Sequence, residues 1–186
     1  MGRPSRIDRR QILNAALGIC DDLGLQAVTM PLVAERLGVT AMALYRHIAD
    51  KNALLDGLIE VLLSEIAAPD PAARWDARLA QLLQQVRGVA RRHSHGFVLL
   101  LERPVVTGPA QAVREHLYAA LRDAGVTDTD VPSVERFIST LALGFAAGEV
   151  SGRFQGRPAD LEREYQQLLT FVLAGIESFR TESTAP

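Results

Sequence analysis

The side chains best suited to a binding function lie between Thr40 and Lys51, in the run TAMALYRHIADK. A solvated helix face normally carries Glu and Lys, whereas this run places small, uncharged residues beside tyrosine, arginine and histidine. Such a face can approach another surface closely, and its residue types match the chemistry of DNA bases and phosphates. The plainer alternative is a helical hairpin without a partner. We favour DNA binding.

Individual roles in DNA binding follow from side-chain chemistry. Thr40 would stand at the start of a helix, where a hydroxyl and free backbone N–H groups can bind a phosphate. Arg46 can donate two hydrogen bonds to guanine O6 and N7. His47 can contact DNA or pack on the first helix of the chain. The residues sized for the floor of the groove, where they could meet thymine methyl groups, are Ala41, Met42 and Ala43.

Other kinds of chemistry are poorly represented. His93 and His95, with Glu102 nearby, are the strongest candidate metal ligands. Two histidines at i and i+2 on a helix point in different directions, unlike the i, i+4 pair of a helical zinc site. No Ser/His/Asp constellation, glycine-rich phosphate loop or cysteine cluster occurs. The sequence therefore predicts no metal, no cofactor and no enzymatic activity. A helical adaptor, or an enzyme that keeps the hairpin only as structure, is the alternative.

Composition sets the broad class of protein. The chain has 186 residues, 48% of them hydrophobic, and a net charge of −2, which fits an ordinary folded protein with a sizeable core. The first 51 residues carry 7 basic and 5 acidic side chains, whereas the rest carries 13 basic and 17 acidic ones. An N-terminal positive balance suits contact with nucleic acid. No apolar run reaches the ~20 residues that span a bilayer, so we expect a cytoplasmic protein with a buried, inert Cys20.

Capping signals divide the N-terminal part of the chain into short helices. Asp8, with Gln11 three residues on, has the form of a capping box. Thr29 can cap a second helix, and Gly38 can end it. Thr40 can cap the third. Two helices joined by a glycine-containing turn form a helix-turn-helix, in which the second helix enters the major groove of DNA.

The region after Asp50 predicts further helices and no strands. A broad stripe of leucine and isoleucine between residues 50 and 67 indicates a connector helix that contacts more than the N-terminal head. No flexible glycine- or serine-rich linker occurs near it, so the two parts should be rigidly coupled. We therefore predict an all-α fold, with a three-helix helix-turn-helix head in residues 1–52, a connector helix over residues 50–67 and a helical bundle in residues 68–186.

Two C-terminal segments have too few partners in a monomer. Residues 133–154 are apolar nearly all round, which indicates a helix buried on every side. From Leu161 to Phe179 apolar residues recur at 4-3-4-4-3 spacing, a pattern typical of a seam for a partner helix. Pairing with the same helices of a second copy around a two-fold axis would cover both. The predicted homodimer interface comprises Phe145, Gly148, Leu168, Val172, Ile176 and Phe179.

The run GVTAMALYRHIADK resembles the recognition helix and following helix start of TetR-family repressors, and the similarity covers residues 7–63. The resemblance implies a ligand-responsive transcriptional repressor that binds a palindromic DNA operator as a homodimer. A short basic arm containing Arg3 and Arg6 could reach phosphates or the minor groove, or remain a solvated terminus. The candidates for phosphate contact that the resemblance implies are Thr29, Tyr45 and Lys51.

The resemblance also implies a pocket for a small-molecule effector in the C-terminal half, which would thus serve ligand binding and dimerisation. Residues 75–92 and 117–126 resemble the subgroup that contains the tetracycline repressor itself. The polar and histidine side chains that hold the drug–magnesium complex there have no residue-by-residue match here, so we expect a more apolar effector. Candidate lining residues, each also compatible with ordinary core packing, are Trp75, His93, Phe97, Leu101, Glu102, Tyr118, Phe137 and Leu141.

Overall fold

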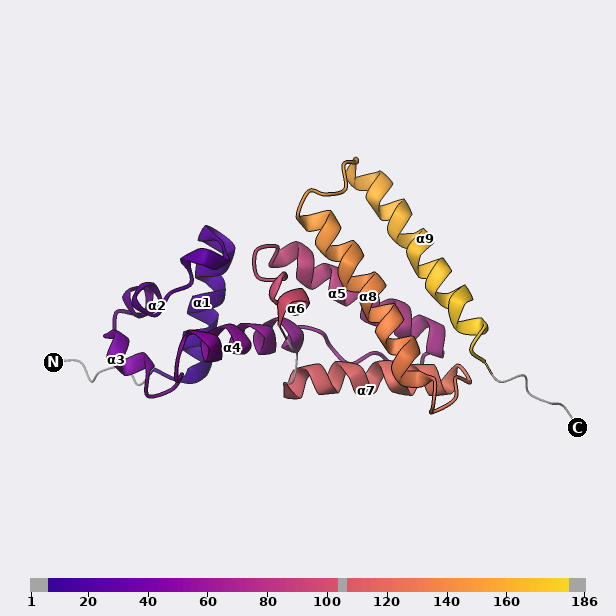
Figure 1. Cartoon of the computed structure of the whole chain (residues 1–186), viewed down its shortest axis with the longest axis horizontal. Coiled ribbons are helices and arrows are strands. Elements are labelled where there is room, and N and C mark those ends of the chain that lie inside the picture. Colours follow the sequence, from indigo (N-terminus) through magenta and orange to yellow (C-terminus); the bar gives the residue numbers. More distant parts are fainter. Residues whose placement is uncertain (1–6, 104–106, 181–186) are drawn as a thin grey trace, which may run out of the picture.

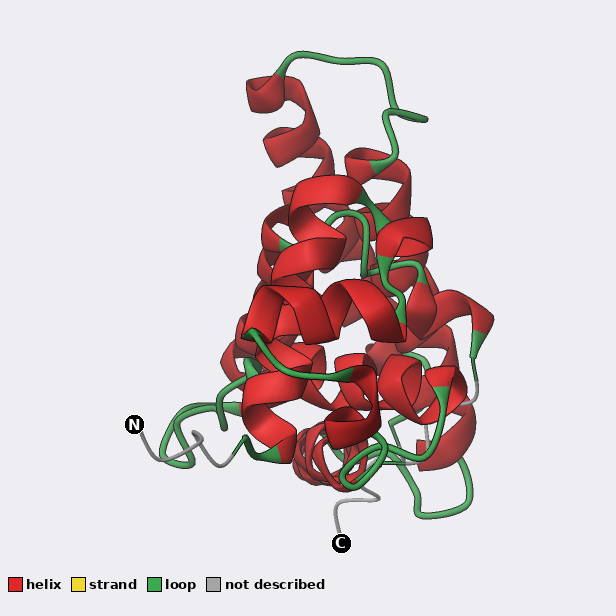
Figure 2. Cartoon of the chain, turned by 90° about the vertical axis from the view of Figure 1, so that its left-hand side faces the viewer, coloured by secondary structure: helices red, strands yellow, loops and turns green. Residues whose placement is uncertain are grey.

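The computed structural model describes residues 7–103 and 107–180 (Figure 1), so Arg3 and Arg6 lie outside the described residues. Within the described ranges the backbone is helical, with loops between the helices and no strand (Figure 2), and the all-α prediction is confirmed. None of these helices is long and apolar enough to cross a bilayer. The helices are α1 (Arg9–Leu23), a 3-10 turn (Leu25–Ala27), α2 (Met30–Leu37), α3 (Ala41–Leu44), α4 (Lys51–Ser64), α5 (Trp75–Arg92), α6 (Leu99–Glu102), α7 (Gly108–Asp123), α8 (Val131–Val150) and α9 (Pro158–Glu177).

The head consists of α1, α2 and α3, and the predicted signals at Asp8, Thr29 and Gly38 set helix ends, whereas the cap predicted at Thr40 does not form. Asp8 Oδ1 accepts a hydrogen bond from the backbone N–H of Gln11 at 2.8 Å, and the Asp8 N–H donates to Gln11 Oε1 at 3.0 Å. Thr29 Oγ1 accepts from the Leu32 N–H at 3.4 Å. Gly38 adopts the left-handed conformation with a φ of 67°, which strains any residue with a side chain. These contacts fix the turn that joins α2 to α3.

Helix α4 connects the head to the rest of the molecule, which we call the body. It packs against α1 of the head and against α6 and α7 of the body (Figure 1). Leu54, Leu58 and Leu62 on this helix are all 0% exposed. A Cβ atom on Gly57 would lie 2.4 Å from a methyl group of Leu13, so α1 and α4 approach too closely for a side chain at this position. The helix ends three residues before the predicted boundary at residue 67, because its last turn tightens into i→i−3 hydrogen bonds.

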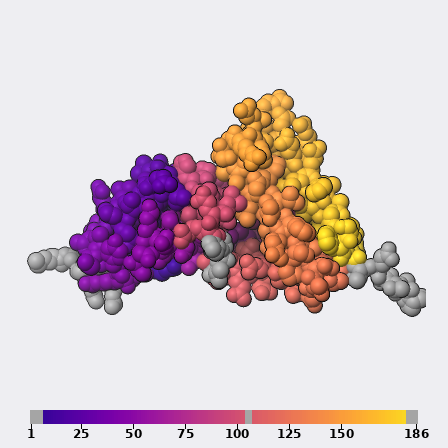
Figure 3. All heavy atoms as spheres, viewed as in Figure 1, coloured from indigo at the N-terminus to yellow at the C-terminus, as the bar shows by residue number. Residues whose placement is uncertain are grey.

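The body is built on α5, α7 and α8, which pack against one another, and α9 lies antiparallel along α8 (Figure 1). The α8–α9 pair stands out from the rest of the body in the space-filling view (Figure 3). Val172 and Ile176 are only 5% and 2% exposed, because the seam on α9 packs within the same protomer. The prediction that these two residues face a partner is therefore wrong.

A buried ion-pair network fastens α9 to the body. Arg87 on α5 is 4% exposed, and its guanidinium donates to Glu149 at 2.7 and 2.9 Å and to Glu162 at 2.7 Å. The same group lies 4.2 Å from the centroid of the Tyr165 ring. Burial alone would raise the pKa of Glu149, but hydrogen bonds from Arg87 and Arg91 lower this pKa below its ordinary value. The carboxylate therefore stays charged in the folded protein.

Removing the buried arginine should destabilise the fold strongly. Arg87→Ala leaves Glu149 as a buried charge without its main partner, which costs about 3–5 kcal/mol of unfolding free energy. Arg157→Ala is the control: it removes an exposed ion pair with Asp160 and should cost less than about 1 kcal/mol. Urea unfolding followed by circular dichroism measures both variants. Equal losses would contradict the role given to the network.

The same pair sets the direction of the pH dependence. Because folding lowers the pKa of Glu149, the unfolded chain binds more protons at acidic pH. The stability contributed by this carboxylate is complete above its unfolded pKa and is lost as the pH falls through the lowered folded pKa. In Glu149→Gln the unfolding free energy should therefore fall less steeply as the pH is lowered through this acidic range. An unchanged dependence of the unfolding free energy on pH would contradict the expectation.

Candidate nucleic-acid interface and ligand cavity

Helix α3 and the turn after it present an exposed face on the head. Leu44 and Ile48 are 0% and 3% exposed and anchor this segment in the core of the head. Met42 and Tyr45 are 71% and 48% exposed. His47 is also exposed, so the structure disfavours the alternative in which it packs on α1. The segment thus combines an anchored apolar side with a side open to a partner.

The cations of this face are free to bind an anion. Arg9 and Arg36, elsewhere on the head, are already paired with carboxylates at 2.6 and 2.8 Å. Within the described part of the chain, Arg46 and Lys51 form no ion pair. Unneutralised basic side chains are what phosphate contacts require. Arg46 and Lys51 therefore give the α3 face free positive charge, and Arg10 on α1 is a further exposed cation of the described head without an ion pair.

Three of the predicted DNA contacts are less accessible than the sequence suggested. Ala41 and Ala43 are half-buried, and Ala41 packs against the core. Thr29 is half-buried and its hydroxyl caps α2. Thr40 is exposed, and its hydroxyl caps no backbone N–H. The exposed members of the predicted DNA-contacting set are Thr40, Met42, Tyr45, Arg46, His47 and Lys51.

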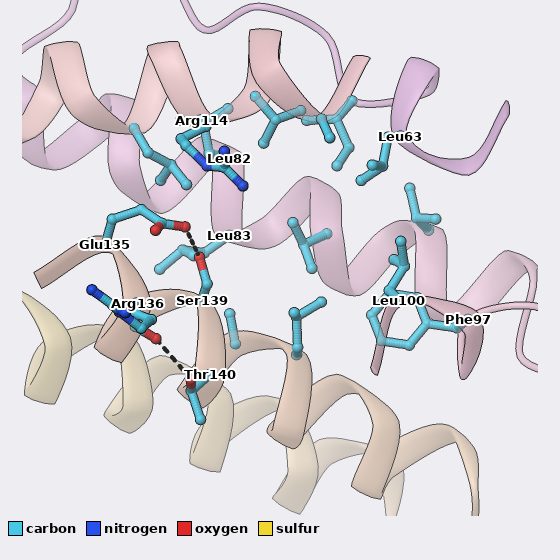
Figure 4. Close-up of a pocket in the computed structure, with 18 residues that line it drawn as sticks. Leu63, Leu82, Leu83, Phe97, Leu100, Arg114, Glu135, Arg136, Ser139 and Thr140 are labelled. Carbon is cyan, nitrogen blue, oxygen red and sulfur yellow. Dashed lines mark hydrogen bonds between the residues drawn. The ribbon is translucent and has the colours of Figure 1, made fainter. Parts of the chain in front are cut away.

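A cavity of about 310 Å³ lies in the body between the end of α4 and helices α5 to α8 (Figure 4). Its size and mostly apolar wall suit a small organic molecule. The apolar lining residues are Leu63, Ile66, Leu82, Leu83, Val86, Val89, Phe97, Leu100, Ala110, Val113, Leu117, Ala142 and Leu143. The polar lining residues gather at one end (Figure 4) and are Arg114, Glu135, Arg136, Ser139 and Thr140.

Of the eight lining residues predicted from the sequence, only Phe97 borders this cavity. Leu101 shares with Phe97 a second hollow, of about 330 Å³, beside the end of α8. Phe137 lies two residues from both Glu135 and Ser139, which face the cavity, and two residues correspond to about 200° around a helix. It is therefore directed away from the cavity. Leu141, two residues from Ser139 and Leu143, is misplaced for the same reason, and both are exposed at 57% and 38%.

The other predicted lining residues also lie elsewhere. Trp75 begins α5, and Glu102 is exposed at the end of α6. Tyr118 lies on α7 with the Arg122 guanidinium 5.7 Å from its ring centroid. His93 contributes to the junction between head and body. These four predictions of pocket residues are therefore corrected.

The polar end of the cavity was not predicted from the sequence. Glu135, Ser139 and Ala142 follow an i, i+4, i+7 spacing that places them on one side of α8. The pocket residues predicted on this helix, Phe137 and Leu141, lie between them in the sequence but on the exposed side of the helix. Arg114 likewise follows the lining residues Ala110 and Val113 at helical spacing on α7.

His93 bridges the head and the body. Its Nδ1 lies 2.9 Å from Asp21 Oδ2 on α1, and its Nε2 lies 2.9 Å from Glu65 Oε1 just after α4. Both ring nitrogens can donate at once only in the imidazolium form. His95 adds a contact from its Nδ1 to the Cys20 carbonyl oxygen at 3.2 Å. The arrangement is a hydrogen-bonded bridge between head and body, and the described residues hold no cluster of three side chains suited to a metal.

Two pKa shifts accompany the bridge. Burial alone would raise the pKa of Glu65, but hydrogen bonds from Arg92 and His93 hold it below its ordinary value. Burial, with a smaller effect from the charge of Asp21, raises the pKa of Cys20 to about 11. The Glu65 carboxylate therefore stays charged, which favours the bridge, and the Cys20 thiol stays protonated and unreactive.

The bridge is attached directly to the wall of the cavity. Glu65 lies between Leu63 and Ile66, which both line the cavity. His93 lies four residues from Val89 on one side and from Phe97 on the other, and these also line it. A change in the shape of the cavity can therefore move the bridge and, through Asp21, helix α1.

The fold and the exposed α3 face define a helix-turn-helix protein with a helical body. Residues 12–58 match the family model for bacterial regulatory proteins of the tetR family, and residues 79–172 match the tetracyclin repressor-like C-terminal domain. The tetracycline repressor protein class A from transposon 1721 of Escherichia coli is 39% identical over 188 aligned positions, which cover 94% of this chain and 82% of that protein. This chain belongs to the tetR family of bacterial regulatory proteins.

Solved structures share the fold. ActR from Streptomyces coelicolor in complex with actinorhodin has a TM-score of 0.83 at 22% identity, covering 95% of this chain and 99% of ActR. BioQ with its double-stranded DNA operator has a TM-score of 0.78 at 26% identity, covering 92% and 99% of the two chains. Two further relatives are named as helix-turn-helix transcriptional regulators. This chain spans only 62% and 57% of their lengths.

The exposed cations predict two different kinds of DNA-binding defect. Lys51→Ala removes the predicted phosphate contact and should weaken binding to every sequence, with a salt dependence about one unit shallower. Arg46→Ala removes the predicted base contact and should cost about 1–3 kcal/mol, with relaxed specificity at one position per half-site. Fluorescence anisotropy with operator and random duplexes at several salt concentrations measures both, with Arg163→Gln on α9 as the control. Identical losses of both variants on both DNAs would contradict the assignment.

Proposed function

We propose that this protein is a ligand-responsive transcriptional repressor that binds a near-palindromic operator as a homodimer and is released by a small, largely apolar molecule. The observation that carries the proposal is an exposed, unneutralised α3 face joined through α4 to an apolar cavity. Residues 1–52 bind DNA, and residues 68–186 bind the ligand and form the dimer. The protein acts in the cytoplasm and has no enzymatic role.

The relatives support this proposal. The class A tetracycline repressor and DrrR1 of Streptomyces coeruleorubidus are both named repressors, and BioQ has been solved on its operator. The cavity favours an effector other than a drug–magnesium complex. None of the described residues that line it is a histidine, and its one carboxylate, on Glu135, already accepts a hydrogen bond from Ser139.

The exposed α3 face carries the DNA contacts in this proposal. Arg46 reads a guanine in the major groove, and Met42 meets the groove floor with Ala41 and Ala43 supporting it from the half-buried side. His47 contacts the DNA because its ring is exposed beside Arg46. The residues that contact phosphate are Thr40, Tyr45 and Lys51, with Thr29 at the edge of the surface.

The exposed side of the α8–α9 pair forms the dimer interface in this proposal. Phe137 on α8 and Phe171 on α9 are 57% and 66% exposed, and large exposed apolar side chains indicate a covered surface. A Cβ atom on Gly144 or Gly175 would meet nothing within 4 Å, so another backbone can approach there. Of the residues predicted from the sequence, Leu168 and Phe179 are half-buried at the edge of this side. Phe145 and Gly148 instead pack against Phe154.

Disrupting this surface should separate the two protomers. Phe171→Glu places a charge in the interface and should give a monomer that binds operator weakly, because a single head makes half the contacts. Thr170→Glu, on an exposed neighbouring side of α9, should remain dimeric. Light scattering measures the mass, and selection from random duplexes by the wild type should yield a near-palindrome. A monomeric wild type, or a selected site without two-fold symmetry, would overturn the proposal.

The proposed release acts through α4 and the His93 bridge. A ligand in the cavity presses on the chain around Leu63 and Ile66, which continues into Glu65 of the bridge. If the cavity binds the ligand ~100-fold more tightly when the head is in one position than in another, the ligand shifts the equilibrium between these two positions by ~2.7 kcal/mol per site. Two such sites in a dimer suffice to move the two α3 faces out of register with the operator.

A further inference from the structure

Arg114 at the polar end of the cavity has no counter-charge among the residues that the structure describes. Its guanidinium extends from α7 into the space between α7 and α8 (Figure 4). Within the described ranges it forms no hydrogen bond and no ion pair, whereas Arg78 and Arg122 of the same body pair with Asp123 and Asp128. A cation that lines a cavity without a counter-charge favours an anionic guest.

The other polar groups at this end do not compete for that role. Ser139 Oγ donates to Glu135 Oε1 at 2.7 Å, and Thr140 Oγ1 donates to the Arg136 carbonyl oxygen at 2.7 Å (Figure 4). Both hydroxyl protons are thus used within α8. The side-chain donors left for a ligand are the guanidinium groups of Arg114 and Arg136. The lining holds a single carboxylate, on Glu135, which is already hydrogen-bonded to Ser139.

The far end of the cavity is apolar and suits a hydrocarbon group. Leu63, Phe97 and Leu100 line it (Figure 4), and a polar group placed there would lose its hydration without gaining a hydrogen bond. Arg114 itself is exposed to solvent, so an anionic group beside it keeps part of its hydration. The cavity therefore suits a molecule with an apolar body and one charged end.

We infer that the effector is an amphiphilic organic acid whose hydrocarbon body fills the cavity and whose acidic group pairs with Arg114. The inference rests on the proposed function, because it names the chemical class of the releasing molecule. It distinguishes the effector from a neutral apolar compound, which would leave Arg114 unpaired. It also distinguishes it from an organic cation, which two guanidinium groups at the same end would repel.

Matched probes test the charge requirement directly. Isothermal titration of the full-length homodimer compares decanoic acid, decanamide and decylamine, and then 2-naphthoic acid with 2-naphthamide. The acid of each pair should bind about tenfold more tightly than its amide, the effect of one charge-assisted hydrogen-bonded pair. The two series show whether a flexible hydrocarbon chain or an aromatic ring system fits the apolar part of the cavity. Equal affinity of acid and amide, tighter binding of the amine, or no binding of any probe would overturn the inference.

Substitutions then locate the effect. Arg114→Gln should remove the preference for the acid and leave the affinity for the amide unchanged, while Arg163→Gln, an exposed arginine on α9, should change neither. Val113→Phe fills the cavity from α7 and should abolish binding of acid and amide alike, with the helical circular dichroism retained. A preference for the acid that survives Arg114→Gln would also overturn the inference.

Operator binding without any probe separates this inference from the proposed function. Wild type and Arg114→Gln should bind the operator equally, since Arg114 lies in the body. If neither binds DNA, the proposed function fails whatever the probes show. If both bind DNA and the acids have no advantage over the amides, the repressor function stands and the chemical class of effector is wrong.

Discussion

The burial of α4 between head and body is the constraint on which the rest of the structure depends. Leu54, Leu58 and Leu62 have no exposed surface, and a Cβ atom on Gly57 would collide with Leu13, so α1 and α4 are closely packed. The His93 bridge adds a second attachment, from the end of α5 to α1. The position of the α3 face is thereby tied to the packing around the cavity.

Unpaired charge distinguishes the surfaces that bind from those that only hold the fold together. Arg87 is buried, and two carboxylates and an aromatic ring surround its guanidinium, so it fastens α9 to the body. Arg46 and Arg114 carry the same group, but within the described part of the chain neither has a counter-charge. Arg46 lies beside α3 and Arg114 in the cavity lining, and the partners proposed for them, a DNA phosphate or base and an acidic ligand, would supply the missing negative charge.

The head could be predicted from the sequence because its signals are local. Asp8, Thr29 and Gly38 set helix ends through contacts within a few residues. The cavity and the dimer surface depend instead on how distant helices turn toward one another. Phe137 was misassigned because an apolar helix does not reveal which side faces a neighbour. Val172 was misassigned because a seam for α8 of the same protomer has the same spacing as a seam for a partner.

The most direct test of rigid coupling is the distance between the two heads of the dimer. A spin label on Met42→Cys is selective, since Cys20 is buried and its pKa is raised to about 11. Double electron–electron resonance without DNA should give one narrow distance distribution, and His93→Gln should broaden it. A broad distribution in the labelled protein that retains His93 would mean that the heads move freely, and would contradict the account.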